Sequence, residues 1–217
     1  MQIVVLDGYC VNPGDVDWSP LKKLGTLSVY DRTHPDMVAQ RLRGADAVFV
    51  NKVRLNRDVI FNARQLKFIG VLATGYDVID VDAARERGIT VANVPAYSTE
   101  AVAQHAIALL LGLCQHVEYH SALVRQGAWT AQPDFSWFEI APTLLYGKTM
   151  GIIGCGRIGT RVARIADALG MRVLGVNPEK KPDFIGEYVP LDTLLSESDV
   201  ISLHCPAKAD TVGLIRK

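Results

Sequence analysis

The sequence has no excess of charge, no secretion signal and no apolar run long enough to cross a membrane. Lys and Arg together number 23, as do Asp and Glu, and no basic run suits nucleic acid or an anionic membrane. The longest apolar run, 106–114, has about half the length of a membrane span and predicts a buried helix. The N-terminal residues lack the charged and then apolar pattern of a signal peptide. These absences predict a cytoplasmic protein with neither a nucleic-acid nor a membrane partner.

Closely spaced cysteines and metal-binding patterns are also missing. The four cysteines are Cys10, Cys114, Cys155 and Cys205, and no pair has C-x-x-C spacing. Reduced thiols in a cytoplasmic protein are therefore the favoured interpretation. His116 and His120 are spaced one helical turn apart, but no acidic set accompanies them, which predicts surface histidines and no metal site.

Short β-branched runs alternate with helical patterns, which is typical of parallel sheets covered by helices on both faces. The predicted strands are 2–8, 26–31, 45–51, 67–74 and 89–94, and the predicted helices between them are 34–44, 57–65 and 81–88. This pattern fills residues 1–97 and predicts a complete, flavodoxin-like domain that would serve as the substrate domain.

The pattern changes after Pro95. Residues 98–119 predict one long helix, with Ser98 or Thr99 as its cap and Glu100 in its first turn. An irregular aromatic stretch follows, and a second α/β pattern starts at Lys148. The fold class is therefore α/β, with two doubly wound parallel-sheet domains, and residues 98–217 form the second, Rossmann-type domain.

A glycine-rich turn, Gly154–x–Gly156–x–x–Gly159, lies between a predicted strand at 149–153 and a predicted helix at 157–170. In this context the first glycine allows the tight turn, the second lets a pyrophosphate approach the backbone, and the third lets helix and strand pack closely. The free N–H groups at the helix start would face the phosphates, with Arg157 and the backbone of Ile158 as further contacts. The alternative interpretation is a helix-initiating turn that binds no ligand.

The strand after this helix, 171–177, ends at Asn177, where dinucleotide-binding proteins usually carry an acid for the adenosine ribose. Asn can bond a hydroxyl, but it does not repel a 2′-phosphate as Asp would. We therefore predict NAD as cofactor and leave NADP open. Lys180 and Lys181 either neutralise such a phosphate or are simply solvated loop charges.

Four separated motifs, taken in order, resemble the D-isomer-specific 2-hydroxyacid dehydrogenases, in particular their glycerate dehydrogenase or hydroxypyruvate reductase branch. They are VLATGYDVIDVDAARERGITVANVP, STEAVAQHAIALLL, GKTMGIIGCGRIGTRVARIADALGMRV and LLSESDVISLHCP. The resemblance implies a hydride transfer between a nicotinamide cofactor and a short 2-oxo or 2-hydroxy acid, with hydroxypyruvate as the preferred substrate. It also implies a homodimer, which agrees with the strongly apolar character of residues 102–114.

Matching positions extend this resemblance to individual residues. Ala73, Thr74 and Gly75 correspond to the backbone cradle of the substrate carboxylate, and Lys52 could pair with the same group. The remaining correspondences are cofactor contacts, namely Thr99 and Val102 beside the nicotinamide, the loop of His204, Cys205 and Pro206 under the adenine and ribose, and Thr211. His105, in the apolar helix, is interpreted as a core or interface histidine.

The family pattern continues beyond Lys217 with a catalytic Arg, Glu and His, so no catalytic residue is expected in this chain. We therefore expect an N-terminal fragment with a truncated second domain, inactive by itself, from a parent dehydrogenase. Two other functions stay open: a non-catalytic, NAD-sensing regulatory or corepressor protein, and a formate or phosphonate dehydrogenase on the same fold.

Overall fold

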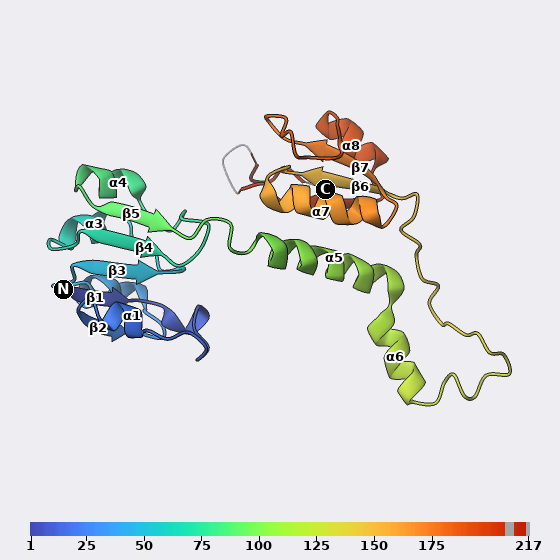
Figure 1. Cartoon of the computed structure of the whole chain (residues 1–217), viewed down its shortest axis with the longest axis horizontal. Helices are drawn as coiled ribbons and strands as arrows, with labels where there is room; N and C mark the ends of the chain where they lie inside the picture. Colours follow the sequence, from blue (N-terminus) through green and yellow to red (C-terminus); the bar gives the residue numbers. More distant parts are fainter. Residues whose placement is uncertain (207–210, 216–217) are drawn as a thin grey trace. The chain divides into compact units, whose positions relative to one another are not determined.

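The chain divides into two compact units, Met1–Tyr97 and Ser98–Lys217. Figure 1 shows the protein as a computed structural model, which describes residues 1–206 and 211–215. Each unit contains its own parallel sheet. The predicted fold class, α/β with two doubly wound parallel sheets, is confirmed.

The first unit is built on a five-stranded sheet with the order β2-β1-β3-β4-β5, in which all neighbours run parallel. Its strands are β1 (Gln2–Val5), β2 (Thr26–Val29), β3 (Ala47–Val50), β4 (Phe68–Val71) and β5 (Thr90–Asn93). Val48, Val50 and Ile69 have no exposed surface, as expected for central strands covered on both faces. The chain reverses its winding direction between β1 and β3, so the carboxyl ends of these strands border the crevice where α/β proteins bind ligands.

The helices of this unit are short. They are η1 (Gly8–Cys10), α1 (Ser19–Lys22), η2 (Pro35–Met37), α2 (Val38–Arg41), α3 (Arg57–Asn62) and α4 (Val81–Glu86). Asn56 caps α3 by accepting from the Val59 N–H, and Asp80 caps α4 by accepting from the Ala83 N–H. The helix predicted at 34–44 is a 3-10 turn followed by a single α-helical turn, and α1 was not predicted.

The second unit contains a four-stranded parallel sheet with the order β8-β7-β6-β9. Its strands are β6 (Thr149–Ile153), β7 (Arg172–Val176), β8 (Glu187–Tyr188) and β9 (Val200–Leu203). All five residues of β6 are buried, which matches its mostly apolar sequence. The winding direction reverses between β6 and β9, so the glycine turn after β6 lies at the switch point of this sheet.

The prediction of one long helix at 98–119 is wrong. The structure has α5 (Thr99–Gln115) and α6 (Val117–Arg125), bent by 55° at His116, whose φ of 50° is left-handed. The His116 N–H bonds to the Gly112 carbonyl and so ends α5. No Gly, Asn or Pro marks this break, because the left-handed residue is itself a histidine. Ser98 is the N-cap of α5, but its side chain makes no capping bond.

Three further expectations about this region need correction. His116 and His120 are half-buried rather than fully on the surface, and His120 Nδ1 lies 3.1 Å from the His116 carbonyl oxygen. His105 is exposed in this chain, which excludes the core alternative, while the interface alternative stays a prediction. The apolar run is buried on one face only: Ile107 and Leu110 are covered, whereas Leu113 is 74% exposed. Among the described residues no single helix is long and apolar enough to span a membrane. Taken together, α5 and α6 have the length and composition of a span, but they are bent relative to one another.

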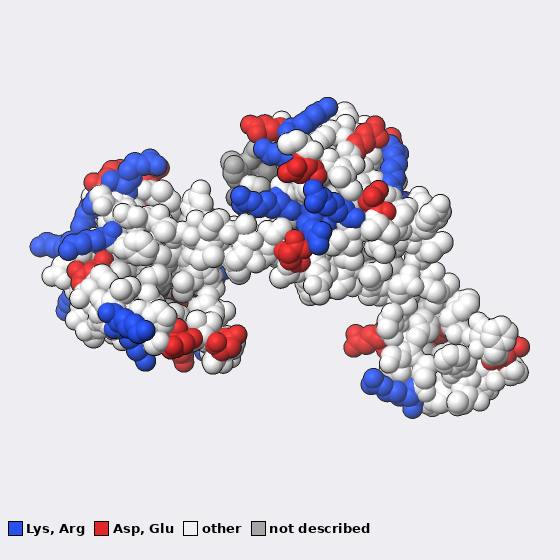
Figure 2. All heavy atoms as spheres, viewed as in Figure 1, with Lys and Arg blue, Asp and Glu red and all other residues white. Residues whose placement is uncertain are grey.

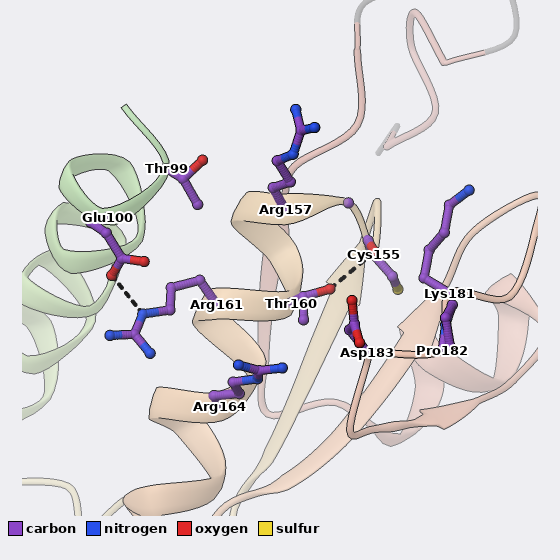
Figure 3. A pocket seen from close by; sticks show the side chains of 11 residues that line it. Thr99, Glu100, Cys155, Arg157, Thr160, Arg161, Arg164, Lys181, Pro182 and Asp183 are labelled. Atoms are coloured by element: carbon purple, nitrogen blue, oxygen red, sulfur yellow. Dashed lines mark hydrogen bonds and ion pairs between the residues drawn. The ribbon is translucent and has the colours of Figure 1, made fainter. Parts of the chain in front are cut away.

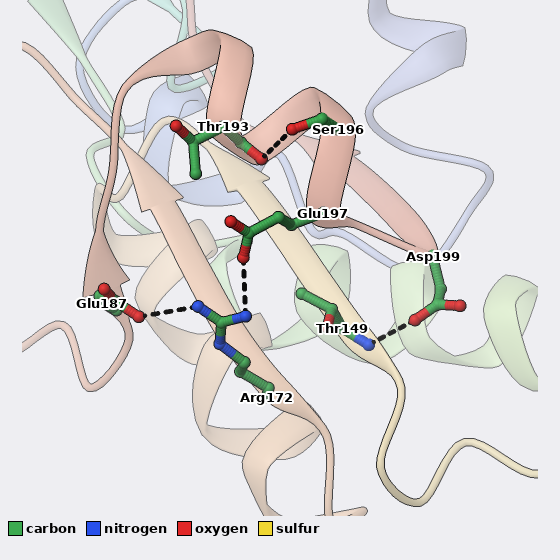
Figure 4. Close-up of polar contacts among 7 residues, drawn as sticks. All are labelled: Thr149, Arg172, Glu187, Thr193, Ser196, Glu197 and Asp199. Atoms are coloured by element: carbon green, nitrogen blue, oxygen red, sulfur yellow. Dashed lines mark hydrogen bonds and ion pairs between the residues drawn. The ribbon is translucent and has the colours of Figure 1, made fainter.

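The helices α7 (Arg157–Ala168) and α8 (Leu191–Glu197) complete the described part of the second unit. Val162 and Ala166 of α7 are buried in the same apolar cluster as Ile107 and Leu110 of α5. On the other face, Arg172 of β7 pairs with Glu187 at 3.0 Å and Glu197 at 2.7 Å, which ties β8 and α8 to the sheet (Figure 4). The elements β8 and α8 were not predicted as separate elements.

Candidate dinucleotide site

The glycine turn begins directly after β6 and has the backbone that its first glycine requires. Gly154 has a φ of 97°, a left-handed conformation that side-chain-bearing residues rarely adopt. A Cβ on Gly154 would lie 2.5 Å from the backbone of His204 and Cys205, which follow β9. Glycine is therefore needed at 154 for both the turn and the close passage of the second loop.

The other two glycines have different surroundings. Gly156 is the N-cap of α7, and a Cβ placed on it would meet nothing within 4 Å. It has no side chain to bond the first N–H groups of α7, which have no partner within the helix. A Cβ on Gly159 would lie 2.1 Å from the Gly154 carbonyl oxygen, so helix and turn can pack this closely only with glycine there. An open, uncapped helix start of this kind fits an anionic group such as a pyrophosphate.

A cavity of about 580 Å³ opens in front of this helix start (Figure 3). Its lining combines the start of α5, the glycine turn, one face of α7 and the loop after β7: Thr99, Glu100, Cys155, Gly156, Arg157, Thr160, Arg161, Arg164, Lys181, Pro182 and Asp183. Four of these side chains are cationic, and Figure 2 shows Lys and Arg gathered over α7. Arg161 is paired with Glu100 at 2.6 Å. The cavity is therefore suited to a ligand with several negative charges.

Asn177 follows β7, as predicted, but its side chain is engaged by the protein backbone. Its Oδ1 accepts from the Cys155 N–H at 3.0 Å, and its Nδ2 donates to the Glu179 carbonyl at 2.6 Å. Lys181 lines the cavity and pairs with Glu179, whereas the Lys180 ammonium lies 5.8 Å from the ring centroid of Tyr188. Of the two lysines considered for a phosphate, the structure thus places Lys181 at the cavity.

The loop after β9 places His204, Cys205 and Pro206 next to the glycine turn. The His204 N–H bonds to the Ile153 carbonyl at 2.7 Å, and its Nε2 lies 2.8 Å from Ser202 Oγ. Burial lowers the pKa of His204 below its usual range. Thr211 Oγ1 donates to the Pro206 carbonyl at 2.5 Å. These contacts fix the loop against the turn.

The predicted cofactor residues do not all reach the cavity. Thr99, Gly156 and Arg157 line it, and the other predicted cofactor residues are not part of the lining. Val102, for example, lies one turn further along α5 and is 39% exposed. The sequence interpretation missed Arg161, Arg164 and Asp183. The arginines could have been found, because residues 157, 161 and 164 recur at the spacing of one helix face.

The predicted substrate residues of the first unit lie in two places. Lys52 lines a cavity of about 590 Å³ together with Asp7, Arg32 and Arg54. The loop after β4 is held differently: Ala73 is buried, Thr74 Oγ1 donates to the Val94 carbonyl at 3.0 Å, and Gly75 is exposed. The described cavity that holds Lys52 includes none of the residues 73–75. Asp7, which the sequence interpretation passed over, is one of the two buried polar residues among those described.

Comparison with known proteins agrees with this geometry. The sequence pattern described as "D-isomer specific 2-hydroxyacid dehydrogenase, NAD binding domain" matches residues 107–217. A hydroxypyruvate reductase of Blautia hydrogenotrophica is 51% identical over 223 residues, covering 100% of this chain and 69% of that protein. The chain belongs to the D-isomer-specific 2-hydroxyacid dehydrogenases. The family resemblance stated from the motifs is thereby confirmed.

Solved structures of this dehydrogenase fold include complexes with both nicotinamide dinucleotides. D-lactate dehydrogenase from Aquifex aeolicus, complexed with NAD and lactic acid, superposes with a TM-score of 0.81 at 32% identity, covering 97% of this chain and 62% of that one. An acyclic imino acid reductase, complexed with NADPH and D-Arg, gives a TM-score of 0.80 at 30% identity, covering 97% and 67%. The cofactor of this dehydrogenase is a nicotinamide dinucleotide. Among the described residues, no group of three or more potential ligands could hold a metal ion.

Proposed function

We propose that the intact protein is a hydroxypyruvate reductase, which converts hydroxypyruvate and glycerate into one another with a nicotinamide dinucleotide. The observation that carries this proposal is the 51% identity to a hydroxypyruvate reductase over the whole of this chain. The chain spans about two thirds of that relative, so the activity is assigned to the intact protein. The residues 1–97 would serve as the substrate domain and 98–217 as the dinucleotide domain.

The cofactor, when bound, supplies or accepts the hydride. The backbone of Gly156, Arg157, Ile158 and Gly159 would hold its pyrophosphate, because no side chain caps the start of α7. His204, Cys205, Pro206 and Thr211 would border its adenosine half, and Thr99 and Val102 its nicotinamide. In the first unit, the backbone of residues 73–75 would bind the carboxylate of the acid. Lys52 lines another cavity, but it follows the neighbouring strand β3, and its long side chain would reach the same carboxylate.

For the cofactor we propose NAD with substantial acceptance of NADP. No carboxylate stands at position 177 to repel a 2′-phosphate. The side-chain oxygen and nitrogen of Asn177 both form hydrogen bonds with the backbone. Lys181 and Arg164 in the cavity lining would offset the added charge of the phosphate. The ratio of the NADH and NADPH dissociation constants tests this point.

We also propose a homodimer in a reducing compartment, the cytoplasm. Leu109 and Leu113 are 56% and 74% exposed on α5, so a second copy could cover this apolar face. The four cysteines are all free, which agrees with a compartment that keeps thiols reduced.

A panel of 2-oxo acids tests the proposed substrate. Hydroxypyruvate, glyoxylate, pyruvate and phosphohydroxypyruvate would be compared with the intact protein by following oxidation of NADH and NADPH. We expect the highest kcat/KM with hydroxypyruvate. Equal values across the panel would reject the substrate, and binding of NADH without turnover of any acid would instead favour the regulatory function.

A further inference from the structure

A buried carboxylate just after β1 accepts hydrogen bonds from the segment that carries Lys52. Asp7 is only 6% exposed and lies two residues after the last residue of β1. Its Oδ1 accepts from the Asn51 N–H at 2.7 Å, and its Oδ2 accepts from the N–H groups of Lys52 at 2.5 Å and Val53 at 3.0 Å. Three consecutive amides therefore point at one carboxylate.

The Asp7 carboxylate is a charged group that is buried without an ion-pair partner among the described residues. Burying a carboxylate is unfavourable unless it is paired or fully hydrogen-bonded. No cation forms an ion pair with Asp7 among the salt bridges of residues 1–206 and 211–215. The hydrogen bonds to its carboxylate come from backbone N–H groups. The chain after Val50 must curl around the carboxylate to supply those N–H groups. A side chain just after β1 is thus bonded to the backbone that follows β3.

The same contacts determine where the Lys52 side chain starts. The shortest of the three bonds is the one to the Lys52 amide, and the Lys52 and Asp7 side chains line one cavity with Arg32 and Arg54. This cavity lies at the crevice between β1 and β3, where the sheet changes its winding direction. The Lys52 ammonium has no carboxylate partner among the described ion pairs, which leaves it available to an anionic ligand.

We propose that Asp7 is a positioning residue for substrate binding, which holds the segment 51–53 so that Lys52 presents its ammonium to the carboxylate of the acid. This inference rests on the proposed function, in which Lys52 binds that carboxylate. Asp7 itself does not touch the acid. Its contribution is to hold the backbone in place before the acid arrives.

Asp46 offers a matched control in the same unit. Its carboxylate also accepts a backbone N–H, from Gln2 at 2.7 Å, and it lies just before β3, at the opposite end of the strands from Asp7. The Asp46→Asn change weakens a carboxylate–amide contact of the same sheet, yet it leaves the segment 51–53 alone. A general loss of sheet stability should therefore follow from either change, and a loss of positioning only from Asp7→Asn.

The experiment measures steady-state kinetics of the intact protein with hydroxypyruvate. In Asp7→Asn, one acceptor oxygen is replaced by a donor that faces other donors, so we expect KM to rise about tenfold while kcat changes less than about threefold. In Asp46→Asn we expect KM within about twofold of wild type. Equal increases in both variants, or none in Asp7→Asn, would overturn the proposal. If Asp7→Asn does not fold, Asp7→Glu, which displaces the carboxylate by one methylene, is measured instead with the same expectation.

A double-mutant cycle shows whether Asp7 acts through Lys52. We expect Lys52→Met to raise KM, and Asp7→Asn to add less than about twofold in the Lys52→Met background. If the double variant raised KM by the product of the two single increases, the two residues would act independently and the proposal would be contradicted.

Hydrogen exchange of backbone amides tests this proposal separately from the proposed function. In the wild type, the N–H groups of residues 51–53 should exchange slowly with solvent, and Asp7→Asn should speed their exchange while leaving the Gln2 amide unchanged. If the wild type fails to reduce hydroxypyruvate, the proposed function is lost, whereas slow exchange that Asp7→Asn abolishes still supports the positioning. Fast exchange of these amides in the wild type would refute the positioning even in an active enzyme.

Discussion

The Asn177 side chain bonds the end of β7 to the glycine turn, since its Oδ1 accepts from the Cys155 N–H at 3.0 Å. This contact is made by the residue that stands where dinucleotide-binding proteins usually carry an acid. The residue therefore supports the shape of the turn, and in the proposed function it would also border the adenosine half of the cofactor.

The first prediction concerns this residue and the choice of cofactor. Asn177→Asp keeps the oxygen that accepts from Cys155, replaces the Nδ2 donor to the Glu179 carbonyl with an oxygen, and adds a negative charge near the proposed 2′-phosphate position. Because the lost bond to Glu179 affects both dinucleotides alike, we expect the affinity for NADPH to fall about tenfold more than that for NADH. Asn177→Ala, which removes the contact to Cys155, should lower the affinity for both NADH and NADPH. Titration of each dinucleotide provides the measurement, and an unchanged NADPH affinity in Asn177→Asp would exclude this position from the phosphate site.

The second prediction uses two glycines of the same turn that differ in their surroundings. In Gly159→Ala the new Cβ would lie 2.1 Å from the Gly154 carbonyl, so we expect a loss of about 1–3 kcal/mol in the free energy of unfolding.

Gly156→Ala is the matched change, because its Cβ would enter open space at the N-cap of α7. We expect the free energy of unfolding to stay within about 1 kcal/mol of the wild-type value. The affinity for the dinucleotide should fall, since the new methyl group stands where a phosphate would approach. Urea unfolding and dinucleotide titration check both variants. A Gly156→Ala protein that binds NADH as the wild type does would place the phosphates elsewhere.

The third prediction is a pH dependence of stability that involves His204. Burial lowers the folded-state pKa of His204, so the unfolded chain binds more protons than the folded chain once the pH falls below the unfolded value of about 6.5. The stability contributed by the neutral, partly buried His204 is therefore present above that pH and declines as the pH falls through it. His204→Gln, which keeps a group able to bond Ser202, should flatten this decline. Urea unfolding at several pH values between about 7.5 and 5.5 tests it, and parallel curves for both proteins would contradict it.

Much of this site could be predicted because it depends on local backbone needs. Gly154 has a left-handed φ and Gly159 packs against the turn, so the spacing of glycines between strand and helix carries the information directly. The apolar runs similarly indicated β3 and β6, whose residues are mostly or wholly buried. The family and the nicotinamide cofactor followed from the same motifs.

Other features depend on contacts between distant residues, which no local pattern reveals. Asp7 gains its role from amides 44 to 46 residues away. The break at His116 needs a left-handed histidine, a conformation that sequence alone does not indicate. The backbone bonds of Asn177 likewise depend on the fold bringing the ends of β6 and β7 side by side.

The fourth prediction tests the proposed dimer through the exposed apolar face of α5. Leu113→Glu places a charge at a residue that is 74% exposed in this chain, so a monomer should tolerate it. If a second copy covers this face, the buried charge should shift the intact protein from dimer toward monomer at micromolar concentration. Gln104→Glu, an exposed polar position on the same helix, is the control and should leave the dimer intact. Sedimentation would show whether Leu113→Glu stays dimeric, in which case the interface lies on another surface.

The fifth prediction concerns the thiol inside the glycine turn. Burial raises the pKa of Cys155 to about 11, although a hydrogen bond with Tyr188 opposes the increase. Because the thiolate is the reactive form, Cys155 should resist alkylation at pH 8, whereas the exposed Cys10 should react readily. Iodoacetamide labelling followed by peptide mass analysis would compare the two sites, and denaturant should expose Cys155 to the reagent. Labelling of Cys155 in the folded protein at the rate of Cys10 would mean that the turn opens in solution, and such a turn could not hold the α7 start ready for a pyrophosphate.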